Sequence, residues 1–138
     1  MSLYACLTAE SLCFKNKIMK LFSFEKLKVG QKARQLSILI YKSTKTFPDE
    51  ERYGLISQMR RCSVSISSNI AEGTGRHSSK DRARFTEIAF SSALELLNQS
   101  ILSNDLEFLP DEHYLKIRKD ITEITAMLDG LYKSQINS

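Results

Sequence analysis

The spacing of apolar residues constrains this chain more than any other feature. Four long segments carry apolar side chains at steps that are mostly three and four residues, the spacing that returns a side chain to one face of a helix. The four apolar stripes consist of Val29, Ala33, Leu36, Ile40 and Phe47; Leu55, Met59, Cys62, Ile66 and Ile70; Phe85, Ile88, Ala89, Leu96 and Leu102; and Tyr114, Ile117, Ile121, Ile124, Leu128 and Leu131. Each segment therefore predicts an amphipathic helix.

Local signals predict where these helices begin and end. The residue before Pro48 avoids the helical region, so the first helix ends there, and the acidic residues 49–51 open the second near the positive end of its dipole. Gly73 is a natural left-handed cap for the second helix, and Ser78 is a natural N-cap for the third. A further proline, Pro110, precedes the fourth helix. Four helices of similar length with short links predict an all-α, antiparallel up-down-up-down four-helix bundle.

The length of 138 residues suits one domain, and the stripes assign residues 23–138 to the bundle. Residues 1–22 are predicted to be an N-terminal extension. Its first 18 residues lack the pattern of a secretory signal, and Met19 opens a plausible natural start, so we expect residues 1–18 to be non-native or loosely ordered. No apolar run approaches the roughly 20 residues of a membrane span, which predicts a soluble protein without a membrane partner.

Three cysteines without CxxC spacing indicate neither a disulfide framework nor a zinc site. A reduced, cytoplasmic protein is expected. His77 and His113 lie on different segments and form no Glu-x-x-His pair of the di-iron type. The serines at positions 65, 67 and 68 have no neighbouring base. The sequence therefore predicts no catalytic residues, no metal and no cofactor.

The net charge of +4 is modest, but it is unevenly distributed. Residues 1–104 carry 16 basic and 9 acidic side chains, whereas residues 105–138 carry 4 and 7. Basic residues surround the predicted N-terminus of the third helix, where free backbone N–H groups already favour anions, and two more lie in the second helix. The candidate nucleic-acid-binding residues are Arg60, Arg61, Arg76, Lys80, Arg82 and Arg84. The alternative to nucleic-acid binding is that these residues form only a solvated rim, or that Arg60 and Arg61 pair with Glu72 or with Glu95 of a neighbour.

Residues 51–73 read ERYGLISQMRRCSVSISSNIAEG, followed by Gly75 and Arg76, and residues 24–33 read FEKLKVGQKA. These two stretches resemble motifs of the 23S rRNA intervening-sequence proteins, a bacterial family of four-helix bundles, and the resemblance extends over about residues 22–135. This chain has Gly30 where the family usually has Trp, Ser67 where proline is common, and Ser91 in place of a usual glycine. These departures leave the expected fold intact and affect packing or assembly.

The resemblance implies a non-enzymatic bundle related to the accessory protein of diversity-generating retroelements, which assembles as a homopentamer. It thereby implies a homo-oligomer, with a pentamer expected. Small and polar residues in the middle of the third helix, Ser92, Glu95 and Gln99, are the candidate oligomer interface. Five copies of a +4 chain would carry about +20, enough to attract a polyanion. We therefore expect an oligomer that binds RNA or DNA through phosphates; the alternative is a scaffold that docks a protein partner such as a reverse transcriptase.

Overall fold

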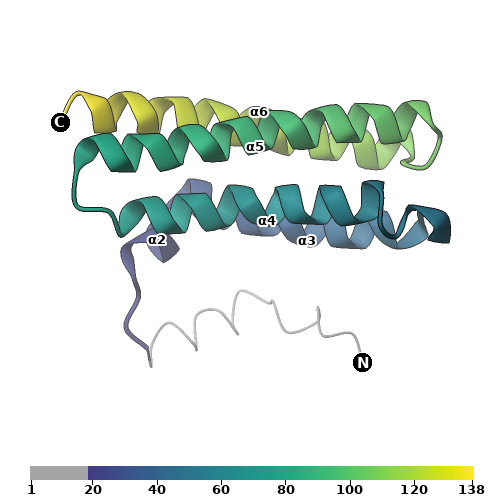
Figure 1. The fold of residues 1–138 in the computed structure, drawn as a ribbon, viewed down its shortest axis with the longest axis horizontal. Coiled ribbons are helices and arrows are strands. Elements are labelled where there is room, and N and C mark those ends of the chain that lie inside the picture. The colour runs from purple at the N-terminus through teal and green to yellow at the C-terminus, as the bar shows by residue number, and fades with distance from the viewer. Residues whose placement is uncertain (1–18) are drawn as a thin grey trace.

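A computed structural model describes residues 19–138, so the expectation for residues 1–18 lies outside the described part of the chain. Figure 1 shows four long helices packed side by side with the short helix α2 before them. The elements are α2 (Ser23–Lys26), α3 (Lys28–Ser43), the 3-10 turns η2 (Thr44–Thr46) and η3 (Asp49–Glu51), α4 (Leu55–Thr74), α5 (Ser79–Asp105) and α6 (Asp111–Ile136). The prediction of an all-α fold is confirmed.

The four long helices form an antiparallel square. Each of α3 and α5 packs against both α4 and α6, so α4 and α6 lie diagonally across the bundle. Consecutive helices run in opposite directions and short turns join them, as the predicted up-down-up-down topology requires. None of the helices in residues 19–138 has both the length and the apolar character needed to cross a bilayer.

The predicted stripes meet in one core. Its fully buried side chains include Leu36 from α3, Ile66 from α4, Leu96 from α5 and Ile121 from α6. Burying a side chain of this size stabilises a protein by about 1.5–3 kcal/mol, so the stripes fix how each helix is rotated about its own axis. Ile88 and Leu102 are exceptions, because both remain partly exposed on α5.

Several predicted boundaries are correct. The Ser78 hydroxyl accepts a hydrogen bond from the backbone N–H of Asp81 at 3.1 Å and caps α5, and Pro110 is the N-cap residue of α6. The second helix begins later than predicted, because residues 49–51 form the separate turn η3. The Glu51 carboxylate instead accepts the backbone N–H of Leu55 at 3.0 Å and so caps α4.

The first predicted helix is divided in two. Leu27 has extended dihedral angles (φ −73°, ψ 125°) and separates α2 from α3. This break leaves the Glu25 carbonyl without its usual helical donor. The side-chain amide of Gln31 donates to that carbonyl at 2.8 Å and replaces the missing backbone bond.

The predicted left-handed cap at Gly73 is wrong. Gly73 lies inside α4, no glycine of residues 19–138 has a positive φ, and the helix ends at Gly75 with φ −86°. A Cβ atom on Gly73 would lie 3.0 Å from the Cβ of Phe85. The glycine is therefore explained by the close approach of α4 and α5 rather than by a left-handed turn.

This explanation predicts opposite effects for one substitution at two helical glycines. Gly130→Ala should raise the free energy of unfolding by about 0.5–1 kcal/mol, because alanine is the better helix former and a Cβ there meets nothing within 4 Å. Gly73→Ala should lower it by about 1–3 kcal/mol, the usual cost of overpacking. Urea unfolding followed by circular dichroism measures both. Equal changes in the two variants would contradict the close-approach role of Gly73.

Candidate nucleic-acid interface

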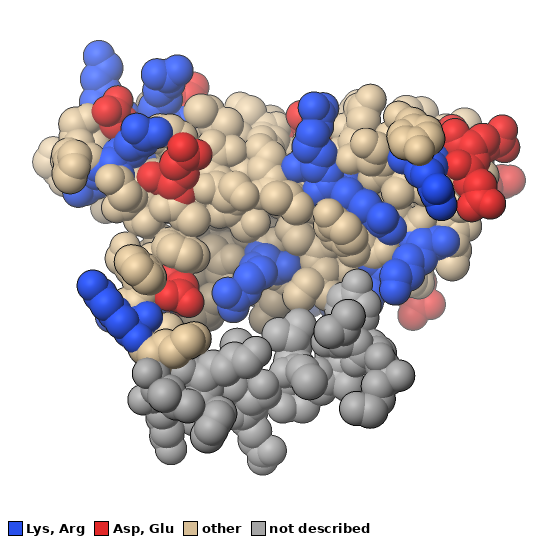
Figure 2. Space-filling model, turned by 60° about the horizontal axis from the view of Figure 1, so that its bottom comes forward, with Lys and Arg blue, Asp and Glu red and all other residues tan. Residues whose placement is uncertain are grey.

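The six predicted basic residues come from α4, the turn after it and the first part of α5, but they have different surroundings. Figure 2 shows the side formed by α3 and α4, where Lys and Arg side chains are spread along the molecule rather than gathered in one cluster. Asp and Glu side chains lie mostly toward its two ends. The contacts of each predicted residue therefore decide whether it is available to a ligand.

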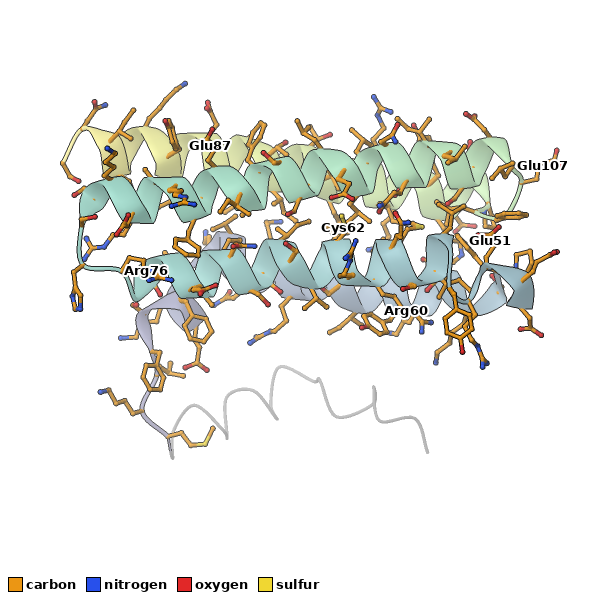
Figure 3. All side chains as sticks on the ribbon, viewed as in Figure 1. Glu51, Arg60, Cys62, Arg76, Glu87 and Glu107 are labelled. Atoms are coloured by element: carbon orange, nitrogen blue, oxygen red, sulfur yellow. The ribbon has the colours of Figure 1, made fainter. Side chains whose placement is uncertain are left out.

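Arg60 is held against α3. Its Nε donates to the Thr44 hydroxyl at 3.0 Å and one terminal nitrogen donates to the Tyr41 carbonyl at 3.3 Å. Its guanidinium also lies over the Tyr41 ring, 4.7 Å from the ring centroid. Figure 3 shows Arg60 on the side of α4 that faces away from α5. Arg60 therefore joins α3 to α4, and the guanidinium forms a fixed, flat, positive surface.

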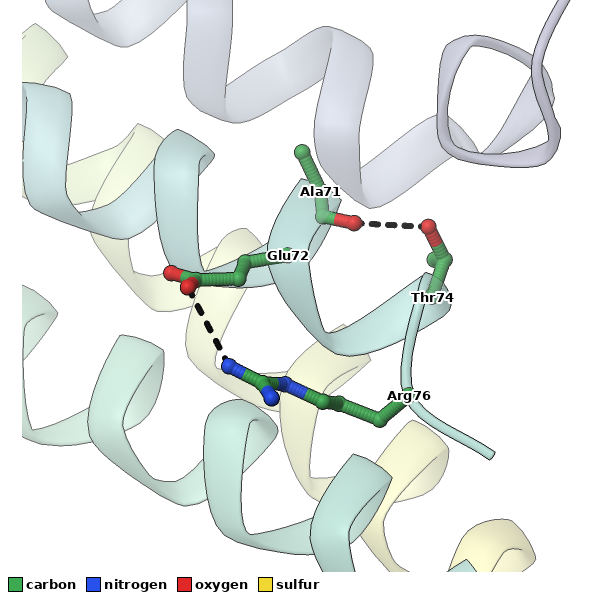
Figure 4. A network of polar contacts seen from close by, with 4 residues as sticks. All are labelled: Ala71, Glu72, Thr74 and Arg76. Carbon is green, nitrogen blue, oxygen red and sulfur yellow. Dashed lines mark hydrogen bonds and ion pairs between the residues drawn. The ribbon is translucent and has the colours of Figure 1, made fainter. Parts of the chain in front are cut away.

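Arg76 and Arg82 stabilise the turn between α4 and α5. Arg76 forms an ion pair with Glu72 at 3.3 Å, drawn in Figure 4 beside the hydrogen bond from the Thr74 hydroxyl to the Ala71 carbonyl. Its guanidinium lies 4.5 Å from the centroid of the Phe85 ring. The Nε of Arg82 donates to the carbonyl of Arg76 at 2.8 Å. Both arginines are exposed, but each already has an intramolecular partner.

Arg61, Lys80 and Arg84 are exposed and make no hydrogen bond or ion pair with any residue of 19–138. Arg61 lies on α4. Lys80 and Arg84 lie one turn apart on α5 and border a surface hollow together with Tyr132 of α6. These three cations are available to an external anion, and of the six predicted residues they are the best candidates for phosphate contacts.

The residues predicted for an oligomer interface lie along the seam of α4 and α5. The Ser92 hydroxyl is 2.9 Å from that of Ser65, and Ser92 is buried. Glu95 is exposed and accepts a weak hydrogen bond from Gln99 at 3.4 Å. The Oε1 atom of Gln99 is buried without a hydrogen-bond partner in residues 19–138. A buried amide oxygen without a donor is unfavourable, and no donor in residues 19–138 reaches the Gln99 Oε1 atom.

Cys62 lies next to this seam, and Figure 3 shows it between α4 and α5. Burial, and after it the nearby Glu95 carboxylate, raises the pKa of the Cys62 thiol to about 12. The thiol is therefore protonated at neutral pH and a poor nucleophile. No group of three or more His, Cys, Asp or Glu residues within residues 19–138 is arranged to hold a metal ion.

Sequence reasoning missed Arg34. It is exposed on α3, one turn after Gly30, and forms no hydrogen bond or ion pair with the described residues. It borders a cavity between α2, α3 and α4 together with Ser67 of α4. Arg34 lies four residues after Gly30 and seven residues before Tyr41, so the three residues share one face of the helix. This spacing could have been recognised from the sequence alone.

Residues 25–130 match the family described as 23S rRNA-intervening sequence protein. The chain belongs to this family. This chain is similar to a solved structure from Bacteroides thetaiotaomicron VPI-5482, a protein of unknown function from the S23 ribosomal protein family. The two are 26% identical with a TM-score of 0.71, and the similarity covers 76% of this chain and 98% of the relative. No curated protein is similar enough to count as a match.

Membership of the 23S rRNA-intervening sequence protein family confirms the resemblance seen in the two motifs. The relation to the accessory protein of diversity-generating retroelements stays a prediction, as do the pentamer and the bacterial cytoplasm.

The contacts of the adjacent arginines predict different effects on stability. Arg60→Ala should lower the free energy of unfolding by about 1–2 kcal/mol, because it removes two hydrogen bonds to α3 and the ring contact. Arg61→Ala should change it by less than about 0.5 kcal/mol, as is usual for an exposed residue without partners. Chemical unfolding of the two single variants measures this difference. A loss at Arg61 as large as that at Arg60 would mean that Arg61 also has a structural role.

Proposed function

We propose that this 23S rRNA-intervening sequence protein is a non-catalytic oligomer that binds RNA or DNA through a basic surface. The observation that carries the proposal is the set of three exposed cations without intramolecular partners, Arg61, Lys80 and Arg84. Unpaired cations favour a polyanion, because neutralising phosphates releases the counterions bound to them. Arg76 and Arg82 lie at the turn before α5, close in sequence to Lys80 and Arg84, and add positive potential there.

Exposed apolar side chains on the α4–α5 seam support assembly. Val64 and Ile88 are 41% and 38% exposed on the two helices of the seam. A second copy packed on the seam would cover these apolar side chains. In a closed ring each copy would also add its cations to one continuous surface.

A second candidate function is a scaffold for a protein partner. Its support is a cavity of about 220 Å³ between α5 and α6, together with two apolar side chains of these helices, Leu94 and Ile136, that are about half exposed. Phe90, Leu128 and Tyr132 contribute to the walls of this cavity. Such a partner would reach Lys80 and Arg84, which border a hollow together with Tyr132 and Ile136, and would leave Arg61 on α4 free.

Removal of two cations tests nucleic-acid binding. Arg61→Gln with Arg84→Gln should weaken binding of an RNA or DNA oligonucleotide and reduce the slope of log K against log salt by about 1.4–1.8 per contacting subunit. The matched control is Lys116→Gln with Lys119→Gln, which changes the net charge equally on α6, the helix that lies diagonally across the bundle from α4. Fluorescence anisotropy at several salt concentrations measures both. Equal losses in the two double variants, or a response independent of salt, would contradict a localised interface.

Charge reversal at the seam tests assembly. Glu95→Arg should shift the sedimentation coefficient toward that of the 15.8 kDa monomer, since it reverses an exposed charge on the α4–α5 seam where a second copy would pack. Glu112→Arg, at the start of α6, makes the same change of charge away from the seam and should leave the assembly intact. An unchanged distribution for Glu95→Arg would exclude Glu95 from the interface.

A further inference from the structure

Helix α5 carries a second apolar stripe besides the one that faces the core. The core-facing stripe is buried and contains small residues, among them Ala89 and Ala93. The second stripe has steps of four, three and four residues and consists of Phe90, Leu94, Leu97 and Ile101. This spacing keeps the four side chains on one face of α5 and is typical of helices that pack against another helix.

The second stripe is only partly covered within the described residues 19–138. Leu94 is 50% exposed, and the other three side chains are half-buried. Phe90 lines the cavity between α5 and α6 together with Tyr132. Glu87 shares this face, because it precedes Phe90 by three residues and Leu94 by seven, and Figure 3 shows Glu87 on the side of α5 that faces away from α4. The stripe is therefore separate from the α4–α5 seam.

Charged side chains of opposite sign lie toward the two ends of α5. Relative to Leu94, two cations lie ten and fourteen residues earlier and two carboxylates lie eleven and thirteen residues later: Arg84, Lys80, Asp105 and Glu107. All four are exposed, and none forms a side-chain hydrogen bond or ion pair with any residue of 19–138. At 1.5 Å per residue, Arg84 lies about 15 Å before Leu94 along the helix axis and Asp105 about 16.5 Å after it.

This distribution of charge makes the exposed face of α5 complementary to itself. A two-fold axis through Leu94 makes two α5 helices antiparallel and places residues at equal distances from Leu94 opposite one another. Asp105 of one copy then lies level with Arg84 of the second copy. Glu107, just beyond the end of α5, lies level with the first turn of the second α5, where Lys80 lies. Each pairing of opposite charges occurs twice, and the two apolar stripes meet between them.

We propose that two copies of this chain associate through the exposed face of α5, antiparallel and with Leu94 at the two-fold axis. The interface goes beyond the proposed function, since it involves neither the α4–α5 seam nor Arg61. Nucleic acid fits this whole face poorly, because the carboxylates of Asp105 and Glu107 repel phosphates. A different protein would need both an apolar stripe and the reversed order of charges, and a second copy supplies both.

A cysteine at the two-fold axis tests this geometry, because a residue on the axis faces its own counterpart and a disulfide needs that proximity. The full chain is used with Cys6→Ser and Cys13→Ser, so that only the buried Cys62 remains. After mild oxidation, Leu94→Cys should give at least about tenfold more covalent dimer than Leu102→Cys on a non-reducing gel. Leu102 is the matched control, since it is 45% exposed on α5 but lies off the stripe.

A charge exchange in the Leu94→Cys chain makes the outcome decisive. Arg84→Glu or Asp105→Lys alone should lower the yield of covalent dimer about five- to tenfold, because each brings like charges together twice. The two changes combined should restore the yield, which a folding defect could not do. Equal yields from Leu94→Cys and Leu102→Cys overturn the inference and leave the proposed function standing, and so does a combined variant that crosslinks as poorly as the single ones.

Discussion

The rotation of α4 about its own axis determines the chemistry of this molecule. Met59, Ile66 and Ile70 are buried in the core shared by the four long helices, and each stabilises the fold by about 1.5–3 kcal/mol. Because neighbouring residues of a helix point about 100° apart, fixing these side chains also directs the residues between them. Arg60 is directed toward α3 and Cys62 toward α5. The core thus determines which cations remain available.

The helices were predictable because their signals are local. Pro110, the Ser78 cap and most of the apolar spacing act within a few residues, and they agree with the structure. Phe47 before Pro48 is extended as expected, but the first helix ends earlier than predicted, because α3 stops at Ser43 and residues 44–46 form the 3-10 turn η2. Gly73 was misinterpreted for a physical reason: a left-handed cap and a close helix approach both require a missing side chain. Only the distance to Phe85, which comes from another helix, distinguishes them. The break at Leu27 is compensated by a contact from Gln31 that no helical pattern encodes.

The candidate site was predictable as a region but not as a set of roles. Adjacent arginines look equivalent in a sequence, yet Arg60 meets residues 16 and 19 positions earlier, and Arg61 meets no such partner. The role of Gln99 was clearer, because a polar residue at an apolar position of a helix must find a partner. In the structure the side-chain nitrogen of Gln99 lies 3.4 Å from Glu95 and 3.5 Å from Gln58 of the same chain, while its buried Oε1 atom has no partner in residues 19–138.

Gly30 illustrates how the fold accepts a weak helix former where elements pack closely. A glycine inside a helix costs about 1 kcal/mol relative to alanine, and Gly30 lies two residues after the start of α3, where the helix has few bonds to lose. A Cβ atom there would lie 3.0 Å from the Phe24 carbonyl oxygen and 3.7 Å from a methyl group of the buried Ile70. The missing side chain therefore lets α2 lie close to α3 and α4, just as Gly73 lets α4 lie close to α5. At both positions a small loss of helix propensity is offset by packing between elements, which no pattern within a single helix encodes.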